Sequence, residues 1–286
     1  MKLSITNLCS IKLPVVLLAA AVSVAACSCR ATPVTGRRQL LLVPESQEVS
    51  QGLAAYHDVV SKEPPSRNRE YVELVNRVGQ RIADVAGRPD YEWEFRVIES
   101  PTQNAFCLPG GKVAVYEGII PVCENEAGLA VVMSHEISHA LARHGGERIS
   151  HQQVAATVQR AVSYVVQDRS ELQQKIVLAA YGGAAQYGAI LPFSREHESE
   201  ADYIGLLLAA QAGYDPREAV PVWERMEQVG GAQPPEFLST HPSHGTRIAD
   251  LQSWMAEALD LYAKAAPAPA TPELPRQPVS QAVYMN

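Results

Sequence analysis

The sequence HEISH at residues 135–139 lies inside a predominantly apolar stretch, residues 127–142. Residues four apart share one face of an α-helix, so a helix over this stretch would present His135 and His139 to a single metal ion. Glu136 would then lie beside the open coordination position of the metal. A bound zinc ion lowers the pKa of a water molecule, and a neighbouring carboxylate can take its proton as the water attacks a carbonyl carbon. The spacing therefore predicts a zinc-dependent hydrolytic site.

A pattern with three fixed positions also arises by chance, so the surrounding residues have to be weighed. The other faces of the predicted helix are apolar, with Leu129, Val132, Met133 and Leu141 among them. Two histidines and a glutamate on a buried helix would be costly without a metal ion. This context favours a metal site over a chance match.

A third protein ligand is expected further along the chain. The metzincin pattern H-E-x-x-H-x-x-G-x-x-H is excluded, because alanine and glycine occupy its glycine and third histidine positions. Glu198 and Asp202 are four residues apart and share a helical face, on which a glutamate can bind zinc and an aspartate can orient a ligand histidine. Glu196 and His197 stay open as alternative ligands, although Asp202 does not lie four residues beyond either of them.

Several short motifs follow one another in order along the chain. They are Asn104-Ala105-Phe106 with Pro109-Gly110-Gly111, the HEISH motif, Ser194-Arg195 with residues 198–202, and His241-Pro242 with Arg247. In this combination, over about residues 105 to 248, the chain resembles the M48 family of zinc metallopeptidases. Residues 35–39, TGRRQ, also resemble the start of the lipoprotein members of that family.

The resemblance implies a mainly helical α+β fold of the zincin type, in which the helix with HEISH packs beside a small antiparallel sheet. It implies a metalloendopeptidase that binds one Zn2+ ion through His135, His139 and Glu198. Glu136 would activate the water, and Asp202 would orient a ligand histidine. The substrates would be unfolded or extended polypeptides.

The resemblance also brings two further motifs close to the metal. His241 would stabilise the oxyanion or cover the metal as a further ligand, and Arg247 would orient substrate or form the wall of the site. Asn104, Ala105 and Phe106 would belong to an edge strand to which an extended substrate adds. The alternative for this stretch is structural, with Asn104 capping a turn and Phe106 filling the core.

Hydrophobic periodicity and turn signals predict the elements around the motif. Helices are expected at residues 45–61, 69–86, 124–146, 151–167, 176–191 and 198–213, from 215 onward, and at 248–262, with strands at 93–98, 105–108 and 112–116. The active-site helix is expected to stop at Gly145-Gly146. Pro221 predicts a kink or a later start for the helix after residue 215. The helix at 176–191 is expected to be buried or to face a membrane.

The first 26 residues predict a signal peptide. Lys2 and Lys12 flank a polar start, and the apolar run of residues 13–26 is too short for a comfortable membrane span. Small residues precede Cys27, as in a lipobox, so we expect lipidation of Cys27 to anchor the mature chain to a membrane. A plain secretory signal is the alternative.

The rest of the chain predicts a linker at residues 27–44, one metallopeptidase domain at 45–265 and a proline-rich disordered tail at 266–286. By resemblance to Gram-negative lipoproteins, the expected location is the periplasmic side of the outer membrane. The net charge of −7 argues against nucleic acid as a partner. Cys107 and Cys123 can pair in an oxidising compartment, although free buried cysteines are also common.

These expectations combine into an endopeptidase that hydrolyses unfolded or misassembled envelope proteins, with Glu136 as the general base. The alternative is a chaperone or a lipoprotein that binds envelope assembly factors, with a zinc site that is structural or is latent because His241 covers it. The two hypotheses differ in whether Glu136→Gln abolishes activity while zinc and the fold are retained.

Overall fold

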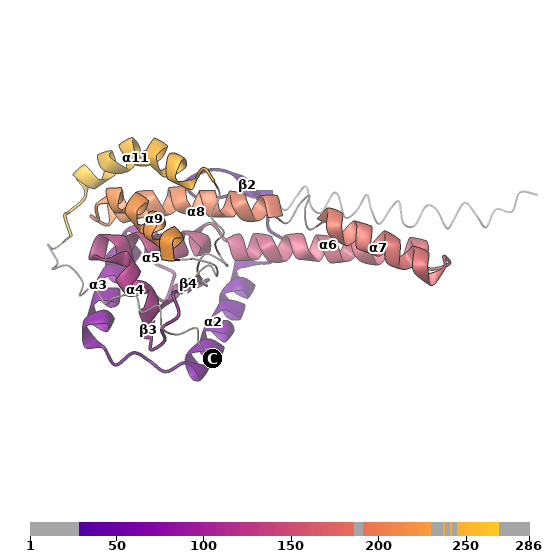
Figure 1. Cartoon of the computed structure of the whole chain (residues 1–286), viewed down its shortest axis with the longest axis horizontal. Helices are drawn as coiled ribbons and strands as arrows, with labels where there is room; N and C mark the ends of the chain where they lie inside the picture. Colours follow the sequence, from indigo (N-terminus) through magenta and orange to yellow (C-terminus); the bar gives the residue numbers. More distant parts are fainter. Residues whose placement is uncertain (1–28, 186–190, 230–236, 238–240, 242–244, 269–286) are drawn as a thin grey trace, which may run out of the picture.

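The computed structural model shows helices packed around a small sheet, with an arm of helices that projects from them (Figure 1). The residues that it describes are 29–185, 191–229, 237, 241 and 245–268. The predicted signal peptide, the lipidation of Cys27 and most of the predicted proline-rich tail fall outside these ranges and stay predictions. Along the described part of the chain, no helix combines the length and the hydropathy that a membrane span requires.

The packing of two helices organises the domain. Helix α5 (Glu126–Leu141) carries the HEISH motif, and helix α8 (Leu191–Gln211) lies against it (Figure 1). Asn125 begins α5, because its side chain accepts a hydrogen bond from a backbone N–H of the first turn. Nearly every residue of α5 is buried, which explains its apolar character on all sides. Gly205 lets the two helices approach closely, since a Cβ there would lie 3.0 Å from the Cα of His135.

The end of α5 differs from the prediction. A stop at Gly145-Gly146 is predicted, but the helix ends before these glycines, and Arg143 adopts the left-handed conformation with a φ of 58°. Helix α6 (His144–Val166) follows at once and contains both glycines. The Arg143 guanidinium donates to the buried carboxylate of Glu48, which packs against the backbone of α6. The left-handed residue between α5 and α6 is therefore Arg143, held by its ion pair with Glu48, and not one of the two glycines.

A three-stranded sheet lies beside α5. Its strands are β3 (Glu94–Ile98), β5 (Lys112–Tyr116) and β4 (Ala105–Leu108), in that order across the sheet. Gly110 and Gly111 have positive φ values in the turn that joins the antiparallel pair β4 and β5. The sheet is mixed and so differs from the predicted antiparallel one. β3 pairs in parallel with β5, which lies in the centre of the sheet. β4 pairs antiparallel with β5 and forms the edge of the sheet, where it packs on α5.

Two short strands form a separate antiparallel pair near the N-terminal end of the described chain. They are β1 (Cys29–Ala31) and β2 (Arg38–Leu40). β2 contacts α6, and Thr32 in the connecting turn is buried. This part of the predicted linker is therefore packed against the domain.

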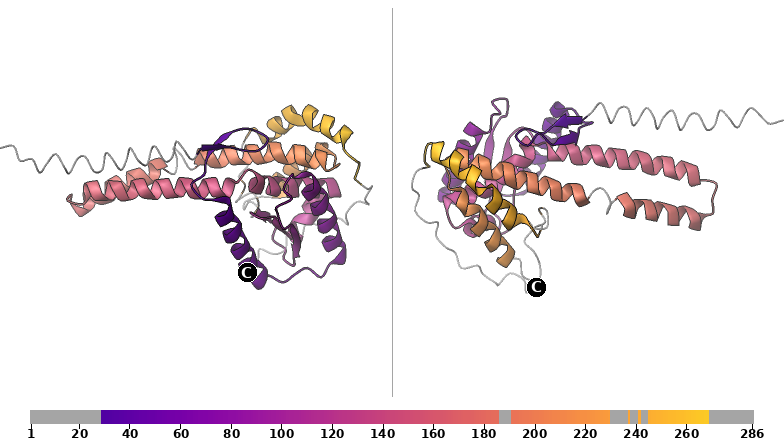
Figure 2. Two further views of the ribbon diagram at one scale, coloured as in Figure 1. Left: turned by 180° about the vertical axis from the view of Figure 1, so that it is seen from behind. Right: turned by 90° about the horizontal axis from the view of Figure 1, so that it is seen from above.

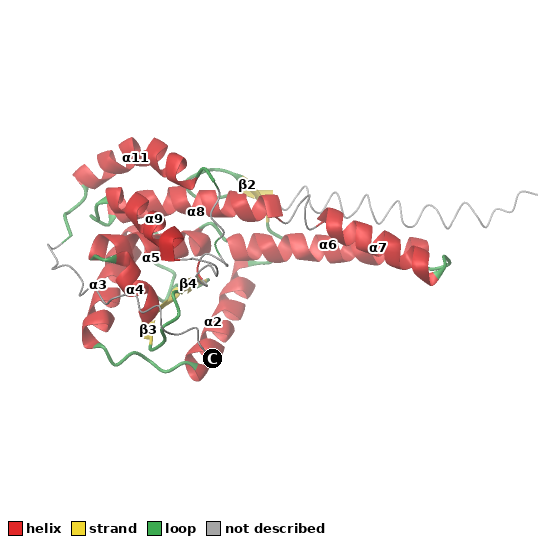
Figure 3. Ribbon diagram, viewed as in Figure 1, coloured by secondary structure: helices red, strands yellow, loops and turns green. Residues whose placement is uncertain are grey.

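The remaining helices close the domain around its core. They are α2 (Glu45–Lys62), α3 (Arg69–Val85), α4 (Ile120–Cys123), α9 (Ala219–Val229) and α11 (Arg247–Lys264). Helix α9 starts at Ala219, so Pro221 lies in its first turn, where a missing N–H costs no helical hydrogen bond. Of the two predictions for Pro221, a kink or a later start, the later start is confirmed. Figure 3 shows that helices dominate the structure, which confirms the mainly helical α+β class.

Helices α6 and α7 (Glu171–Ala185) form a hairpin that projects from the domain (Figure 2). A buried or membrane-facing helix is predicted over residues 176–191. Helix α7 covers residues 176–185 of this range, Leu191 begins α8, and residues 186–190 lie outside the described part of the chain. Val165 and Ile176 on the hairpin are 76% and 59% exposed. Ile176 therefore lies at the surface of the hairpin, which differs from a buried helix, and the membrane-facing alternative stays a prediction.

Cys107 in β4 and Cys123 in α4 are both buried and both free thiols. The thiol of Cys123 donates to the carbonyl oxygen of Ile119 at 3.4 Å. The disulfide that the sequence left open is not formed, and both cysteines act as small apolar residues of the core.

We expect Gly205→Val to force α8 away from α5. The added carbon atoms would meet the backbone of His135, which cannot move aside as a flexible side chain can. The free energy of unfolding should fall by about 2 kcal/mol, measured by thermal denaturation. Gly182→Ala in α7 is the matched control, because a Cβ there would have no neighbour within 4 Å. Unchanged stability of the Gly205 variant would contradict the close packing.

Candidate active site

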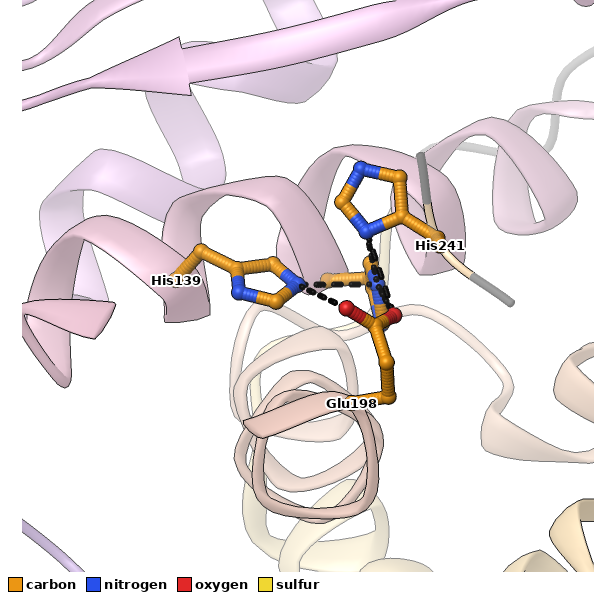
Figure 4. Close-up of side chains that lie close together, drawn as sticks. His139, Glu198 and His241 are labelled. Atoms are coloured by element: carbon orange, nitrogen blue, oxygen red, sulfur yellow. Dashed lines mark hydrogen bonds and ion pairs between the residues drawn. The ribbon is translucent and has the colours of Figure 1, made fainter. Parts of the chain in front are cut away.

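The three predicted ligands and His241 converge on one point. Figure 4 shows His139, Glu198 and His241 of this group. His135 and His139 come from α5, and Glu198 reaches them from α8. Nε2 of His135 lies 3.2 Å from Nε2 of His139 and 3.4 Å from Oε2 of Glu198. One possible ligand atom from each of the four residues lies within 4.8 Å of the others. Imidazole nitrogen and carboxylate oxygen in this arrangement form a donor set suited to zinc.

The chemistry of this cluster fits a divalent cation. Oε1 of Glu198 is buried, has no hydrogen-bond partner and lies 3.7 Å from Nε2 of His139. Burial lowers the pKa of His139 well below its usual value, so its ring offers an unprotonated nitrogen at neutral pH. Lone pairs that face one another in a buried space are favourable when a cation lies among them.

The alternative third ligands point elsewhere. Nε2 of His197 lies 2.8 Å from a carboxylate oxygen of Glu147, and Glu196 is exposed. Successive residues of a helix point in directions about 100° apart, so Glu198 alone of the three faces α5. The structure therefore brings Glu198 into the cluster and leaves both alternatives outside it.

Asp202 contacts the outer nitrogen of His135, as its spacing from Glu198 predicts. Its Oδ1 lies 2.9 Å from Nδ1 of His135, and its Oδ2 accepts from Nε of Arg247 at 2.7 Å. Burial lowers the pKa of His135, but the contacts with Asp202 and Glu198 outweigh burial and raise it to about 10. Arg247 is 1% exposed and lies 3.9 Å over the ring of Trp223, so it lies buried behind the ligands. Its role, in orienting substrate or in forming the wall of the site, stays a prediction.

Glu136 is buried next to the ligand cluster. Its Oε1 atom accepts no hydrogen bond and lies 3.5 Å from Nε2 of His241. Burial raises the pKa of Glu136 above its ordinary value, and a less acidic carboxyl group is a stronger base. These features suit a general base, and that role stays a prediction.

His241 lies over the cluster from the side opposite to α8 in the close-up (Figure 4). Its Nδ1 is 3.1 Å from Oε2 of Glu198 and 3.4 Å from Nε2 of His135. Its ring stacks on Phe237 with a centroid distance of 4.8 Å. Because Nδ1 points at the other ligand atoms, this position suits a further ligand better than a donor to a substrate oxyanion.

The predicted substrate-binding residues lie at the start of the edge strand β4. Oδ1 of Asn104 accepts from the backbone N–H of Ala105 at 2.9 Å, and its carbonyl oxygen accepts from Tyr116 at 3.0 Å. Ala105 is buried and Phe106 is half-buried. The strand therefore presents its backbone edge next to the helix that carries the ligands, while its side chains contribute mainly to packing.

Several polar residues gather behind His139, and of these only His197 was considered from the sequence, as an alternative ligand. They are Arg37, His144, Glu147, His197 and Glu200. His144 lies closest, with its Nδ1 2.8 Å from Nδ1 of His139. These residues come from three separate parts of the sequence. Arg37 lies in the TGRRQ stretch at 35–39 and Glu200 in the motif at 198–202, but neither motif predicted the cluster.

Residues 69–255 match the sequence model of Peptidase family M48. The chain belongs to this family. The match and the ligand cluster confirm the expected zincin-like fold and the expected family. The family match and the cluster of possible ligands support a metal site in this M48 chain, without identifying the metal.

The M48 chain is similar to longer curated proteins. It is 38% identical over 231 residues to Mitochondrial metalloendopeptidase OMA1 of Schizosaccharomyces pombe, covering 79% of this chain and 66% of that protein. Metalloendopeptidase OMA1, mitochondrial, of Homo sapiens is 30% identical over 243 residues, with 80% and 46% covered. The Beta-barrel assembly-enhancing protease of Escherichia coli is 28% identical over 212 residues, with 72% and 43% covered. The chain thus spans less than two thirds of the length of these relatives.

These comparisons correct the expected location. A position on the periplasmic side of the outer membrane of a Gram-negative bacterium is predicted from the N-terminal sequence. The relatives from Schizosaccharomyces pombe and Homo sapiens are named as mitochondrial proteins, at 38% and 30% identity. The bacterial relative is more distant, at 28% identity, so the prediction of an outer-membrane location is wrong on these comparisons.

We expect Asp202→Asn to weaken metal binding while leaving the ligand atoms in place. The neutral amide would hold the His135 ring less firmly and would reduce the basicity of its metal-facing nitrogen, so affinity should fall by about 10-fold or more. Competition with a chromophoric chelator measures this affinity. Asp260→Asn, which changes an exposed carboxylate on α11, is the control. Equal affinity in both variants would contradict the role of Asp202.

Proposed function

We propose that this M48 protein is a zinc-dependent endopeptidase whose substrates are unfolded or extended polypeptides. The observation that carries the proposal is the meeting of His135, His139 and Glu198 beside the buried carboxyl group of Glu136. A structural metal site needs the ligands alone. A hydrolytic site also needs a base beside the ligands, and the buried carboxyl group of Glu136 supports this role.

The mechanism assigns a separate task to each residue. Zinc, when held by His135, His139 and Glu198, supplies an acidified water and polarises the substrate carbonyl group. Glu136 takes the proton of the attacking water on a carboxylate oxygen and then delivers it to the leaving amide nitrogen. Asp202 keeps the His135 ring in one orientation throughout, so that the ligand set does not reorganise during the reaction.

The edge strand β4 supports extended polypeptide as the substrate. β5 covers one side of β4, and the edge of the sheet lies on the other side, next to α5. A peptide that adds to this edge would be bound through backbone hydrogen bonds, which do not depend on its side chains. Few segments of a folded protein are both extended and free to pair, so this mode of binding favours unfolded or misassembled chains.

Fewer observations support envelope proteins as the substrates, or assembly factors as partners. This support comes from the Escherichia coli relative, whose name refers to β-barrel assembly, at 28% identity. The OMA1 relatives are named for their location and for metalloendopeptidase activity. We therefore propose the physical state of the substrate, unfolded or misassembled, and offer envelope proteins as one class to test.

A second function, as a chaperone or assembly factor with a latent metal site, is favoured by one observation. Nδ1 of His241 lies as close to Glu198 as the other imidazoles do. A fourth protein ligand closes a catalytic metal site, because the position for water or substrate is then taken. The activity of His241 variants therefore separates the two functions.

We expect Glu136→Gln to lower the cleavage of casein by the full chain by about 10²- to 10⁴-fold, because an amide cannot accept the proton of the water. Zinc content should not change, since Glu136 is not one of the ligands. Glu73→Gln, at an exposed site on α3, is the matched control. Peptide-bond cleavage and bound zinc are measured on the same samples. Undiminished cleavage by the Glu136 variant would refute the proposed mechanism.

We expect His241→Ala to bind zinc more weakly and to cleave casein faster than the wild type. Removal of the imidazole deletes one possible ligand atom and opens the coordination position for water. Steady-state cleavage and chelator competition measure the two effects. His57→Ala, on the exposed face of α2, controls for the loss of a histidine. Slower cleavage with unchanged zinc affinity would instead identify His241 as a donor to the oxyanion.

A further inference from the structure

The metal ligand His139 has a second histidine behind it. Nδ1 of His139, the nitrogen that faces away from the ligand cluster, lies 2.8 Å from Nδ1 of His144. Nε2 of His144 lies 3.0 Å from Oε2 of Glu200. His144 is 1% exposed and Glu200 is buried, so this chain of contacts is shielded from water.

A single placement of hydrogen atoms satisfies every contact in this chain. Metal binding requires a lone pair on Nε2 of His139, so its hydrogen is on Nδ1 and is donated to Nδ1 of His144. The hydrogen of His144 is then on Nε2 and is donated to the carboxylate of Glu200. In this arrangement His144 fixes both the tautomer and the ring orientation of the ligand.

Stacking holds the His144 ring in its plane. The ring of His197 lies parallel to it, with a centroid distance of 4.2 Å and an interplanar angle of 8°. His197 is itself held by Glu147, whose Oε2 lies 2.8 Å from its Nε2. A rotation of His144 would therefore break both the stack and the hydrogen bond to Glu200.

The turn between β1 and β2 completes the arrangement. Thr32 Oγ1 donates to Glu200 at 2.7 Å, and Thr35 contacts the same carboxylate. Arg37 joins the two acidic residues, with Nε 2.7 Å from Glu200 Oε2 and Nη2 2.7 Å from Glu147 Oε2. A segment far from the ligands in the sequence thus fixes the carboxylate on which His144 depends.

His135, the other ligand histidine, is also backed by a carboxylate and an arginine, but without an intervening histidine. His135 contacts Asp202, and Asp202 accepts from the buried Arg247. His139 reaches a carboxylate and an arginine through one additional residue, His144. Each ligand ring on α5 is therefore backed by a carboxylate that an arginine holds in place.

We propose that His144 is a positioning residue for the metal ligand His139, and that the N-terminal turn of residues 32–37 belongs to the metal site because it holds Glu200. This inference rests on the proposed metal site. Outer hydrogen bonds of this kind typically contribute 10- to 100-fold to metal affinity. The ring of His144 does not itself touch the metal or the substrate in this role.

The experiment compares His144→Phe and His144→Gln in the full chain. Phenylalanine keeps a flat ring against His197 but has no nitrogen, whereas the glutamine amide can accept from His139 and donate to Glu200. His57→Phe on α2 is the control for loss of a histidine. Metal-free proteins are titrated with Zn2+ against a chelator and with Co2+, whose visible absorption bands report the ligand geometry. Circular dichroism compares the folding of the metal-free forms.

We expect His144→Phe to lower Zn2+ affinity by about 10- to 100-fold and to shift the Co2+ bands, with partial recovery of both in His144→Gln. Affinity and bands equal to those of the wild type in His144→Phe would overturn the inference. So would equal losses in the two variants, because they would indicate a packing role alone. A wild-type chain that binds neither ion would overturn the proposed metal site itself, and the inference with it.

Glu200→Gln keeps the test decisive if His144→Phe does not fold. This change preserves the shape of the side chain and its contact with His144 but removes the negative charge that polarises the histidine pair. Relative to the wild type, we expect a loss of Zn2+ affinity of up to about 10-fold and a shift of the Co2+ bands. Unchanged affinity and bands in a folded Glu200→Gln protein would overturn the inference.

Discussion

Close contact between α5 and α8 brings the two halves of the metal site together. Gly205 faces the backbone of α5 at the level of His135, so the helices approach without an intervening side chain. Glu198 and Asp202 then reach across from one helix to the two histidines of the other. Because protein interiors are densely packed, a shift of one helix would be transmitted to every ligand distance at once.

Buried charges impose the second constraint. Carboxylates removed from water are costly unless arginine or histidine partners and hydrogen bonds compensate them. Arg247 provides this for Asp202 and Glu198, and Arg37 provides it for Glu147 and Glu200. For Glu147, burial opposes ionisation, but the contacts with His197 and Arg37 outweigh it and lower the pKa to about 2. The acidic residues behind the ligands therefore stay charged and fixed, which preorganises the metal site.

The substrate side of the site is built differently. The ligands on α5 and α8 are backed by buried polar contacts, whereas β4 and His241 approach from the other side of the cluster. Access to the metal would depend on the position of His241, since its Nδ1 lies among the ligand atoms. Buried ion pairs thus lie behind the ligands of α5 and α8, whereas His241 lies among the ligand atoms themselves.

Local sequence patterns determined much of this protein. The i, i+4 spacings of the HEISH motif and of Glu198 with Asp202 predicted the ligand cluster, because such spacings have one geometric meaning on a helix. Helices α2 and α3 and the three strands of the sheet were also predicted, as was the late start of α9 at Pro221. Hydrophobic periodicity and proline act over a few residues and leave their signal in the sequence.

Only the tertiary structure decided the rest. The parallel pairing of β3 with β5, the end of α5 at the pair of Arg143 with Glu48, and the exposure of the hairpin of α6 and α7 each depend on which distant segments meet. The support of His139 by His144 and Glu200 depends on a turn near the N-terminus. Contacts between residues far apart in the chain produce no local periodicity, so the sequence by itself does not reveal them.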